Sequence, residues 1–338
     1  MSKEFKRTER SNILIHWTGK DIDAQDQKFS KTLPVNWRKY CLRPIEQPSL
    51  IEEPTLIKAY VNRLRDILKF GLWVTNDKSI DDIGKESSCS KDDGRVYETP
   101  NVARVCFTEL KLSESRKHAF EFGRLGIGMK KMFLVKRGGQ PMIYIADKKG
   151  HKEPNWFLSE ESHEVQNCFF KFMSETEDLN YKYYSESEWR IAYPNKASVK
   201  HPTVKAIKKY VININGNLDK EVKKYKDINR VNVSKAELDS FIKQNKEKGF
   251  RFLVPLNFWL AIIIYPCPAV KIAAEQDDEI RNLMRCTRRQ GIDRFSNLLL
   301  AQEKDSLLKE LGQLGVSKGV GEYYMMPMEI DLDTISHF

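Results

Sequence analysis

Short apolar stretches separated by polar segments recur along the chain and predict an alternation of strands and helices. Between about Pro54 and Gly71, apolar side chains recur every three or four residues after an acidic start, which predicts an amphipathic helix. Four other stretches predict strands: 12–19, 72–75, 103–110 and 183–194. The first half of the chain therefore indicates a sheet with a packed helix.

The middle of the chain continues this alternation. A glycine-marked stretch at 122–129 is followed by two apolar stretches, 131–137 and 141–147, which predict two strands joined as a hairpin around "GGQ". Residues 159–179 show helical spacing of apolar side chains, so we expect a helix there. Residues 76–100 carry no period and predict an exposed loop.

The most apolar run, at 252–266, predicts a buried strand. It is too short for a bilayer-spanning helix and is interrupted by Pro255 and Asn257. Two helices are expected after it, at 273–291 and about 293–311, the first of which has acids at its start and bases at its end.

These elements predict an α+β fold, with a mixed or antiparallel sheet core flanked by helices. The chain has 338 residues, 41% of them hydrophobic, which is enough for a substantial core. We expect five segments: a flexible tail at 1–11, a core with the candidate site at 12–194, a lysine-rich insertion or subdomain at 195–250, a C-terminal strand and helices that complete the core at 251–315, and a tail at 316–338.

Charge and cysteine content indicate the kind of binding partner and the cellular compartment. The net charge of +10 favours an anionic partner, and lysines dominate 195–250, which is either a solvated charged face or a surface for nucleic acid or an acidic partner. Six scattered cysteines without a CxxC pair favour neither zinc nor disulfides and fit a reducing cytoplasm. The polar N-terminus lacks the apolar core of a signal peptide, so we expect a cytoplasmic protein.

The stretch "ESEWR" is the most unusual polar motif. In a strand, Glu186, Glu188 and Arg190 share one face, and the two carboxylates lie about 6.6 to 7 Å apart. This geometry suits paired acid and base chemistry. It also suits a solvated strand edge, or an ion pair in which Arg190 keeps the acids inert.

The order of several landmarks resembles that of the bacterial abortive phage-infection family AbiGi and a related group of uncharacterised proteins. The landmarks are "ILIHWTG", "FGLWVT", "VCFTE", "FGRLGIGM" and "ESEWRI". Their order is also similar to that of ADP-ribosyltransferases, which build an NAD site from a histidine on the first strand, a middle-strand position and a late glutamate. The resemblance implies an ADP-ribosyltransferase-like fold and an anti-phage function, either ADP-ribosyl transfer to a macromolecule or breakdown of NAD.

The resemblance also implies roles for individual residues. Glu188 would stabilise the cationic ribose as nicotinamide leaves, and Glu186 would help the acceptor attack. NAD is then a substrate, and no metal is required. Its binding would involve four residues: His16, Thr18, Thr108 and Arg190. The aromatic side chain that would stack on nicotinamide is one of four: Trp17, Trp73, Tyr144 or Trp189.

Other functions have weaker motifs. The glycines at 123, 126 and 128 reverse the GxGxxG order of a dinucleotide-binding turn. Cys106 with His16 and Glu109 could form a thiol hydrolase, and His151, His163 and Cys168 lack compact metal-ligand spacing. The main alternative is a non-catalytic antitoxin or sensor of a defence pair that binds a partner protein or nucleic acid.

Overall fold

A computed structural model describes eleven segments of the chain. They are 13–23, 54–74, 103–109, 115–146, 168–173, 187–193, 201–229, 233–246, 252–256, 259–284 and 327–335.

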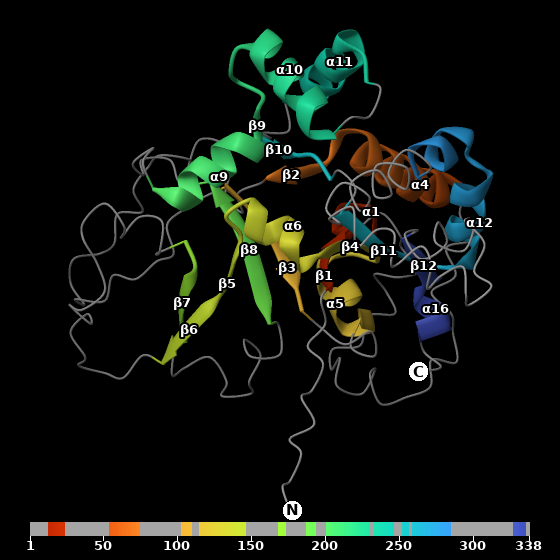
Figure 1. Ribbon diagram of the computed structural model, residues 1–338. Helices are drawn as coiled ribbons and strands as arrows, with labels where there is room; N and C mark the ends of the chain where they lie inside the picture. The colour runs from red at the N-terminus through yellow and green to blue at the C-terminus, as the bar shows by residue number, and fades with distance from the viewer. Residues whose placement is uncertain are drawn as a thin grey trace, which may run out of the picture.

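Within these segments, the largest sheet has seven strands in the order β12-β11-β4-β1-β3-β8-β5 (Figure 1). Its strands are β1 (Ile13–Thr18), β3 (Ala103–Thr108), β4 (Leu125–Lys130), β5 (Gln140–Pro141), β8 (Glu188–Tyr193), β11 (Leu260–Tyr265) and β12 (Met328–Asp331). Only β11 and β12 pair in parallel, and the other neighbours in this sheet are antiparallel. The sheet is therefore mixed, and strands from both ends of the chain meet in it.

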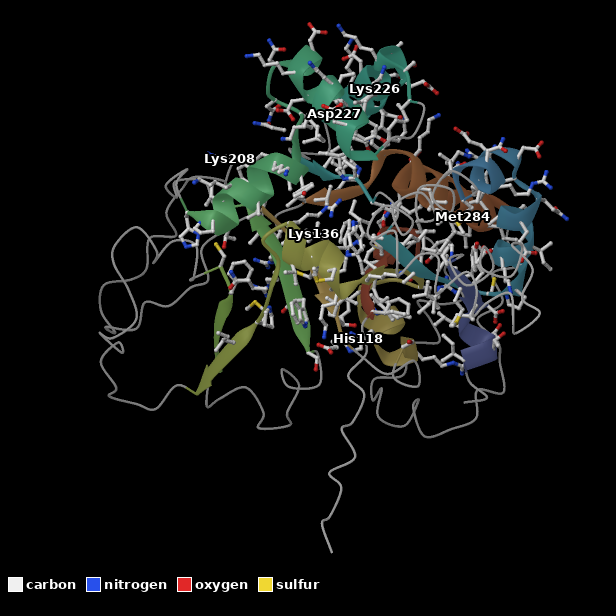
Figure 2. The ribbon with its side chains drawn as sticks, viewed as in Figure 1. His118, Lys136, Lys208, Lys226, Asp227 and Met284 are labelled. Carbon is white, nitrogen blue, oxygen red and sulfur yellow. The ribbon has the colours of Figure 1, made fainter. Side chains whose placement is uncertain are left out.

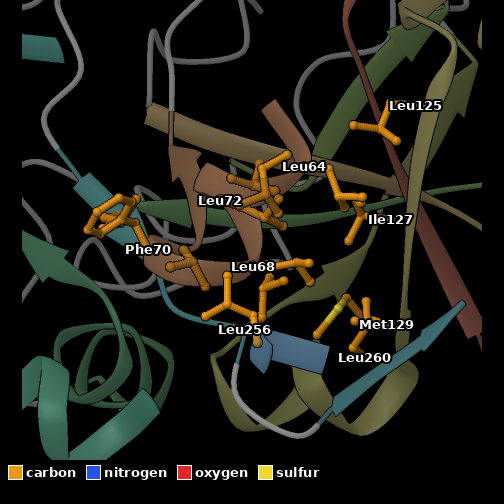
Figure 3. Close-up of a cluster of buried hydrophobic side chains, with 14 of the residues drawn as sticks. Leu64, Leu68, Phe70, Leu72, Leu125, Ile127, Met129, Leu256 and Leu260 are labelled. Carbon is orange, nitrogen blue, oxygen red and sulfur yellow. The ribbon is translucent and has the colours of Figure 1, made fainter. Parts of the chain in front are cut away.

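One face of this sheet, called the first face, carries Leu14, Phe107 and Ile127. It is covered by three helices, α4 (Pro54–Phe70), α6 (Lys131–Lys136) and α12 (Pro268–Gln276). Leu64 and Leu68 of α4 point toward the side chains of β4 in the main core (Figure 3). The helical period predicted from the sequence thus places one side of α4 against the sheet.

The opposite face, called the second face, carries Ile15 and Trp17, because side chains alternate along β1. It is covered by two helices, α5 (Ser115–Phe122) and α16 (Leu332–Ile335); α16 is drawn below β12 in Figure 1. Ala119 of α5 and Leu332 of α16 join Ile15 and Trp17 in a separate small core. The two faces are thus packed by different parts of the chain.

The lysine-rich part of the chain forms a helical layer at the top of Figure 1. Its elements are α9 (Pro202–Tyr210), β9 (Ile212–Asn213), α10 (Leu218–Asn229) and α11 (Lys235–Lys246). β9 pairs with β10 (Phe252–Val254), which pairs with β2 (Leu72–Val74), in a three-stranded antiparallel sheet. Through this sheet, the lysine-rich layer is connected by backbone pairing to β2, the strand that follows α4. One further short helix, α1 (Lys20–Asp23), follows β1.

Two predicted elements are wrong. Residues 131–136 form helix α6 and not a strand, since Phe133, Leu134 and Arg137 make one buried helical side. Within the predicted helix at 159–179, residues 170–173 form strand β7 (Phe170–Met173), which pairs in parallel with β6 (Ile143–Ala146). Both stretches are short apolar runs, for which the period alone does not separate a helix from a strand.

The C-terminal region also differs from the prediction. The apolar run 252–266 supplies two strands, β10 and β11, which belong to different sheets. The helix expected from residue 273 starts earlier, at Pro268, and is broken at Asp277. Residues 328–335, expected to belong to a tail, form β12 and α16, because β12 pairs with the buried strand β11.

The predicted α+β class with a mixed sheet flanked by helices is confirmed. The helix predicted between about Pro54 and Gly71 is confirmed as α4. The strands predicted at 12–19, 72–75 and 103–110 are confirmed as β1, β2 and β3, and the described part of 183–194 contains β8. Among the described helices, none combines the length and the apolar character needed to cross a bilayer.

Candidate functional site

Polar side chains of β3 and β8 lie together on the second face of the seven-stranded sheet. Thr108 pairs with Glu188 across these strands and with Ile15 of β1 on its other side, so these three residues form one row. Cys106 and Arg190 pair in the next row. Directly paired residues point to the same face, so four polar side chains gather on the second face next to the small core of Ile15 and Trp17.

Glu188 and Arg190 form a two-point ion pair. Arg190 Nε donates to Glu188 Oε1 at 2.6 Å and Arg190 Nη2 donates to Glu188 Oε2 at 3.0 Å. The side chains are only 10% and 7% exposed. The solvated-edge interpretation of this stretch is therefore wrong, because β8 lies between β3 and β5 and its charges are buried.

Cys106 belongs to the same group of side chains. Burial, together with the nearby Glu188 carboxylate that accepts a hydrogen bond from the thiol, raises the pKa of Cys106 to about 12. A thiol of this kind stays protonated at neutral pH and is a poor nucleophile. His16 contacts the backbone carbonyl of Cys106 and not its sulfur, and Glu109 is bound by Lys131 and Trp189. These contacts do not assemble the thiol hydrolase considered from the sequence.

His16 and Thr18 lie on the first face, where they approach α4. His16 Nδ1 donates to the carbonyl of Cys106 at 2.9 Å, which leaves Nε2 as an acceptor. Desolvation, helped by the positive charge of Arg63, lowers the pKa of His16 below its usual value. Arg63 Nη1 also donates to Thr18 Oγ1 at 3.1 Å. His16 is therefore a neutral, partly buried imidazole between the sheet and α4.

Of the site residues expected from the sequence, the structure brings three together: Thr108, Glu188 and Arg190. Side chains alternate along β1, and Ile15 pairs with Thr108, so Ile15 and Trp17 share the face of Thr108. His16 and Thr18 therefore point to the opposite side of the same sheet. Glu186 lies outside the described residues.

The aromatic candidates are also separated by the fold. Trp17 lies on the second face, on the side of Thr108 and Glu188. Trp189 lies on the first face, where its indole N–H donates to Glu109 Oε2 at 3.1 Å. Trp73 stacks on Phe241 near the lysine-rich layer, and the side chain of Tyr144 is outside the described part of the structure. Of the three described tryptophan candidates, Trp17 alone lies on the same face of the sheet as Glu188.

Two glycines of the "FGRLGIGM" stretch make room for this arrangement. Both lie in β4 on the second face, opposite Trp17 and Ile15. A methyl group at Gly126 would approach the Trp17 ring to 2.9 Å, and one at Gly128 would approach Ile262 Cγ2 to 2.0 Å. These glycines thus serve the packing of the second face.

Three features of this region gave no signal in the sequence. Ser115 and His118 of α5 are buried, at 0% and 1% exposure, and His118 stacks on Phe122 of the same helix. Figure 2 labels His118. Ser187, directly before Glu188, has a φ of 39°, which is rare for a residue with a side chain. Its carbonyl accepts a hydrogen bond from the Glu109 amide at 3.1 Å. Backbone strain of this kind concentrates at functional sites.

A search of the described residues finds no group of three His, Cys, Asp or Glu side chains that could hold a metal ion. Cys168 packs with Phe169 and Met142, whereas His151 and His163 lie outside the described residues. Neither a protein-family model, nor a curated protein, nor a solved structure matches this chain.

Proposed function

We propose that this chain is a bacterial anti-phage protein of the abortive-infection type that cleaves the nicotinamide–ribose bond of NAD. ADP-ribose is then transferred to a macromolecule or to water. The proposal rests on a landmark order that resembles those of the AbiGi family and of ADP-ribosyltransferases, and on one observation. The late glutamate, Glu188, and the middle-strand hydroxyl, Thr108, are directly paired on the second face.

The chemistry requires a fixed negative charge next to the ribose. The bond between ribose C1′ and the nicotinamide nitrogen breaks, and its electron pair leaves with nicotinamide. The sugar becomes oxocarbenium-like, and a buried carboxylate stabilises this cation strongly. Each oxygen of Glu188 accepts one hydrogen bond from Arg190, and these two bonds hold the carboxylate in a fixed orientation on the second face.

The role of Glu186 rests on the resemblance alone, and the other roles also use where the described side chains lie. The acceptor, a hydroxyl or a water, forms the new bond to C1′ and loses its proton, for which Glu186 is the proposed base. Thr108 contacts the ribose. Arg190 orients Glu188 through its two hydrogen bonds. His16 and Thr18 are not used, because they lie on the first face.

The test is nicotinamide release and label transfer from NAD, measured by mass spectrometry in a cell extract. Wild-type protein and the Glu188→Gln variant are compared, and the variant should lose nearly all activity. Glu109→Gln is the matched control, because this carboxylate directly follows Thr108 in the chain but lies on the first face, bound to Lys131 at 2.6 Å. Activity that survives Glu188→Gln, or that is absent from the wild type with both normal and phage-infected extract, would refute the proposal.

Glu188→Gln leaves Arg190 without its buried partner and can reduce stability. The double variant Glu188→Gln/Arg190→Gln removes both charges. It therefore separates a loss of activity caused by the missing carboxylate from one caused by unfolding. It should be folded, as judged by circular dichroism, and inactive. A folded, active double variant would also refute the proposal.

The second candidate is a non-catalytic defence component that binds nucleic acid. The observation that favours it is a set of exposed lysines on α9 and α10, on the side of the molecule away from α5 (Figure 2). They are exposed, whereas Val204 and Ile207 of α9 and Val222 and Tyr225 of α10 are buried. Among the described residues, no salt bridge involves these lysines. The set comprises Lys205, Lys208, Lys209, Lys220, Lys223 and Lys226.

Two neighbouring lysines provide a matched control. Lys235 and Lys243 are also exposed but are paired with Asp219 and Asp239. Lys224 is excluded from the set, since it donates to the carbonyl of Val211 and burial lowers its pKa.

Binding of duplex or single-stranded DNA and RNA is measured against salt concentration. Glutamine at the six lysines should weaken binding and lower the salt slope by about one for each lysine that contacts a phosphate. If glutamine at the control lysines, Lys235 and Lys243, weakens binding equally, the surface of α9 and α10 is excluded as the nucleic-acid site.

A further inference from the structure

Three buried hydrogen-bond donors near Glu188 lack partners. They are the indole Nε1 of Trp17, the Oγ1 of Thr108 and the Oγ of Ser115, none of which has a hydrogen-bond partner within the described structure. Their residues are 6%, 7% and 0% exposed. Leaving such a group unsatisfied costs about 1 to 3 kcal/mol, so each calls for a specific explanation.

Trp17 and Thr108 are neighbours on the second face. Ile15 pairs with Thr108 and the strands are antiparallel, so Trp17, two residues further along β1, lies in the row of Cys106 and Arg190. The benzene edge of its indole packs on Gly126 of β4. The ring is therefore held in place by the sheet.

The direction of α5 places Ser115 at the level of the row that contains Thr108. Gly123, just after this helix, packs on the backbone of Thr18, so the C-terminal end of α5 lies at the end of β1. Eight residues of helix cover about 12 Å. Three residues of strand, from Thr18 back to Ile15, cover about 10 Å. Ser115 therefore lies level with Ile15 and hence with Thr108.

The middle of α5 supports this placement. Ala119, one helical turn after Ser115, packs with Ile15 and Trp17. Residues four apart lie on the same side of a helix, so Ser115 also faces the sheet. The three donors thus come from β1, β3 and α5 and surround the row of Glu188 and Thr108.

We infer that Trp17, Thr108 and Ser115 form the polar wall of a ligand site on the second face, which binds the oxygen atoms of a ribosyl nucleotide. This inference rests on the proposed function and adds Trp17 and Ser115 to its site. The indole donates only, whereas the two hydroxyls both donate and accept. Such a set matches sugar hydroxyls and amide or ester oxygens. Glu188 lies beside these groups to complement the positive charge that develops on the sugar.

The test is calorimetric binding of ADP-ribose, which carries the ribosyl nucleotide without the bond that is cleaved, to wild type, Thr108→Val and Ser115→Ala. Each variant should bind about 2- to 10-fold more weakly, the loss expected for one hydrogen bond. Thr203→Val is the matched control: this threonine is also buried, but its hydroxyl accepts from Gln140 Nε2 at 3.3 Å. It should bind ADP-ribose as the wild type does.

Melting temperatures give a second, independent comparison. Removing an unsatisfied hydroxyl should leave the melting temperature of Thr108→Val and Ser115→Ala unchanged or raise it, whereas Thr203→Val should lower it. Equal ADP-ribose affinity in wild type and both variants would overturn the inference and leave the proposed reaction standing if NAD is still cleaved. Absence of both ADP-ribose binding and NAD cleavage in the wild type would overturn both.

Discussion

The ion pair between Glu188 and Arg190 predicts a strong energetic coupling. Two hydrogen bonds of 2.6 and 3.0 Å join the side chains, which are 10% and 7% exposed. At an effective dielectric constant of about 20, unit charges about 4 Å apart attract by about 4 kcal/mol. Glu188→Gln or Arg190→Met alone removes the oppositely charged partner of a buried ion pair, and we expect each to destabilise the protein by about 3 to 5 kcal/mol.

The double variant Glu188→Gln/Arg190→Met tests this expectation, because it leaves neither charge uncompensated. It should be at least about 2 kcal/mol more stable than the sum of the single effects predicts. The free energies of unfolding come from urea denaturation followed by circular dichroism, with the slopes compared to confirm a common transition. Two results would refute a buried, coupled ion pair. One is a double variant whose change in the free energy of unfolding equals the sum of the single changes, and the other is single changes below about 1 kcal/mol, as measured for exposed pairs.

Three further predictions concern positions around the two faces. Gly128→Ala places a methyl group 2.0 Å from Ile262 Cγ2, so it should lower the free energy of unfolding by about 1 to 3 kcal/mol; an unchanged urea midpoint would contradict the packing of the second face. Burial lowers the pKa of His16 below 6.5, so the unfolded chain is protonated first and stability should fall as pH drops below that value. His16→Gln should flatten this part of the pH profile in urea titrations, and an equally steep profile would exclude His16 as its source. Ser187→Gly should raise the melting temperature by relieving up to about 1 kcal/mol of strain at its φ of 39°, and a lower melting temperature would mean that the side chain contributes more than the strain costs.

Local patterns in the sequence determined much of the architecture. The helical period was sufficient to predict α4, because only one side of that helix is buried. Short, mainly apolar stretches were sufficient to predict β1, β3 and β8, which are buried on both faces. The alternation of side chains along a strand placed Glu188 and Arg190 on one face. Other short apolar runs were ambiguous, and tertiary contacts made 131–136 a helix and 170–173 a strand.

The composition of the site was decided by tertiary structure. The period of two orders the side chains within β1 and within β3, but it carries no information about how the two strands are aligned. The pairing of Ile15 with Thr108 places Trp17 on the side of Glu188 and turns His16 toward α4. A shift of one residue would reverse this assignment, and α5 brings Ser115 to the site from a separate segment. The sequence thus determined which residues share a face within a strand, whereas strand register and helix packing decided which strands contribute to one site.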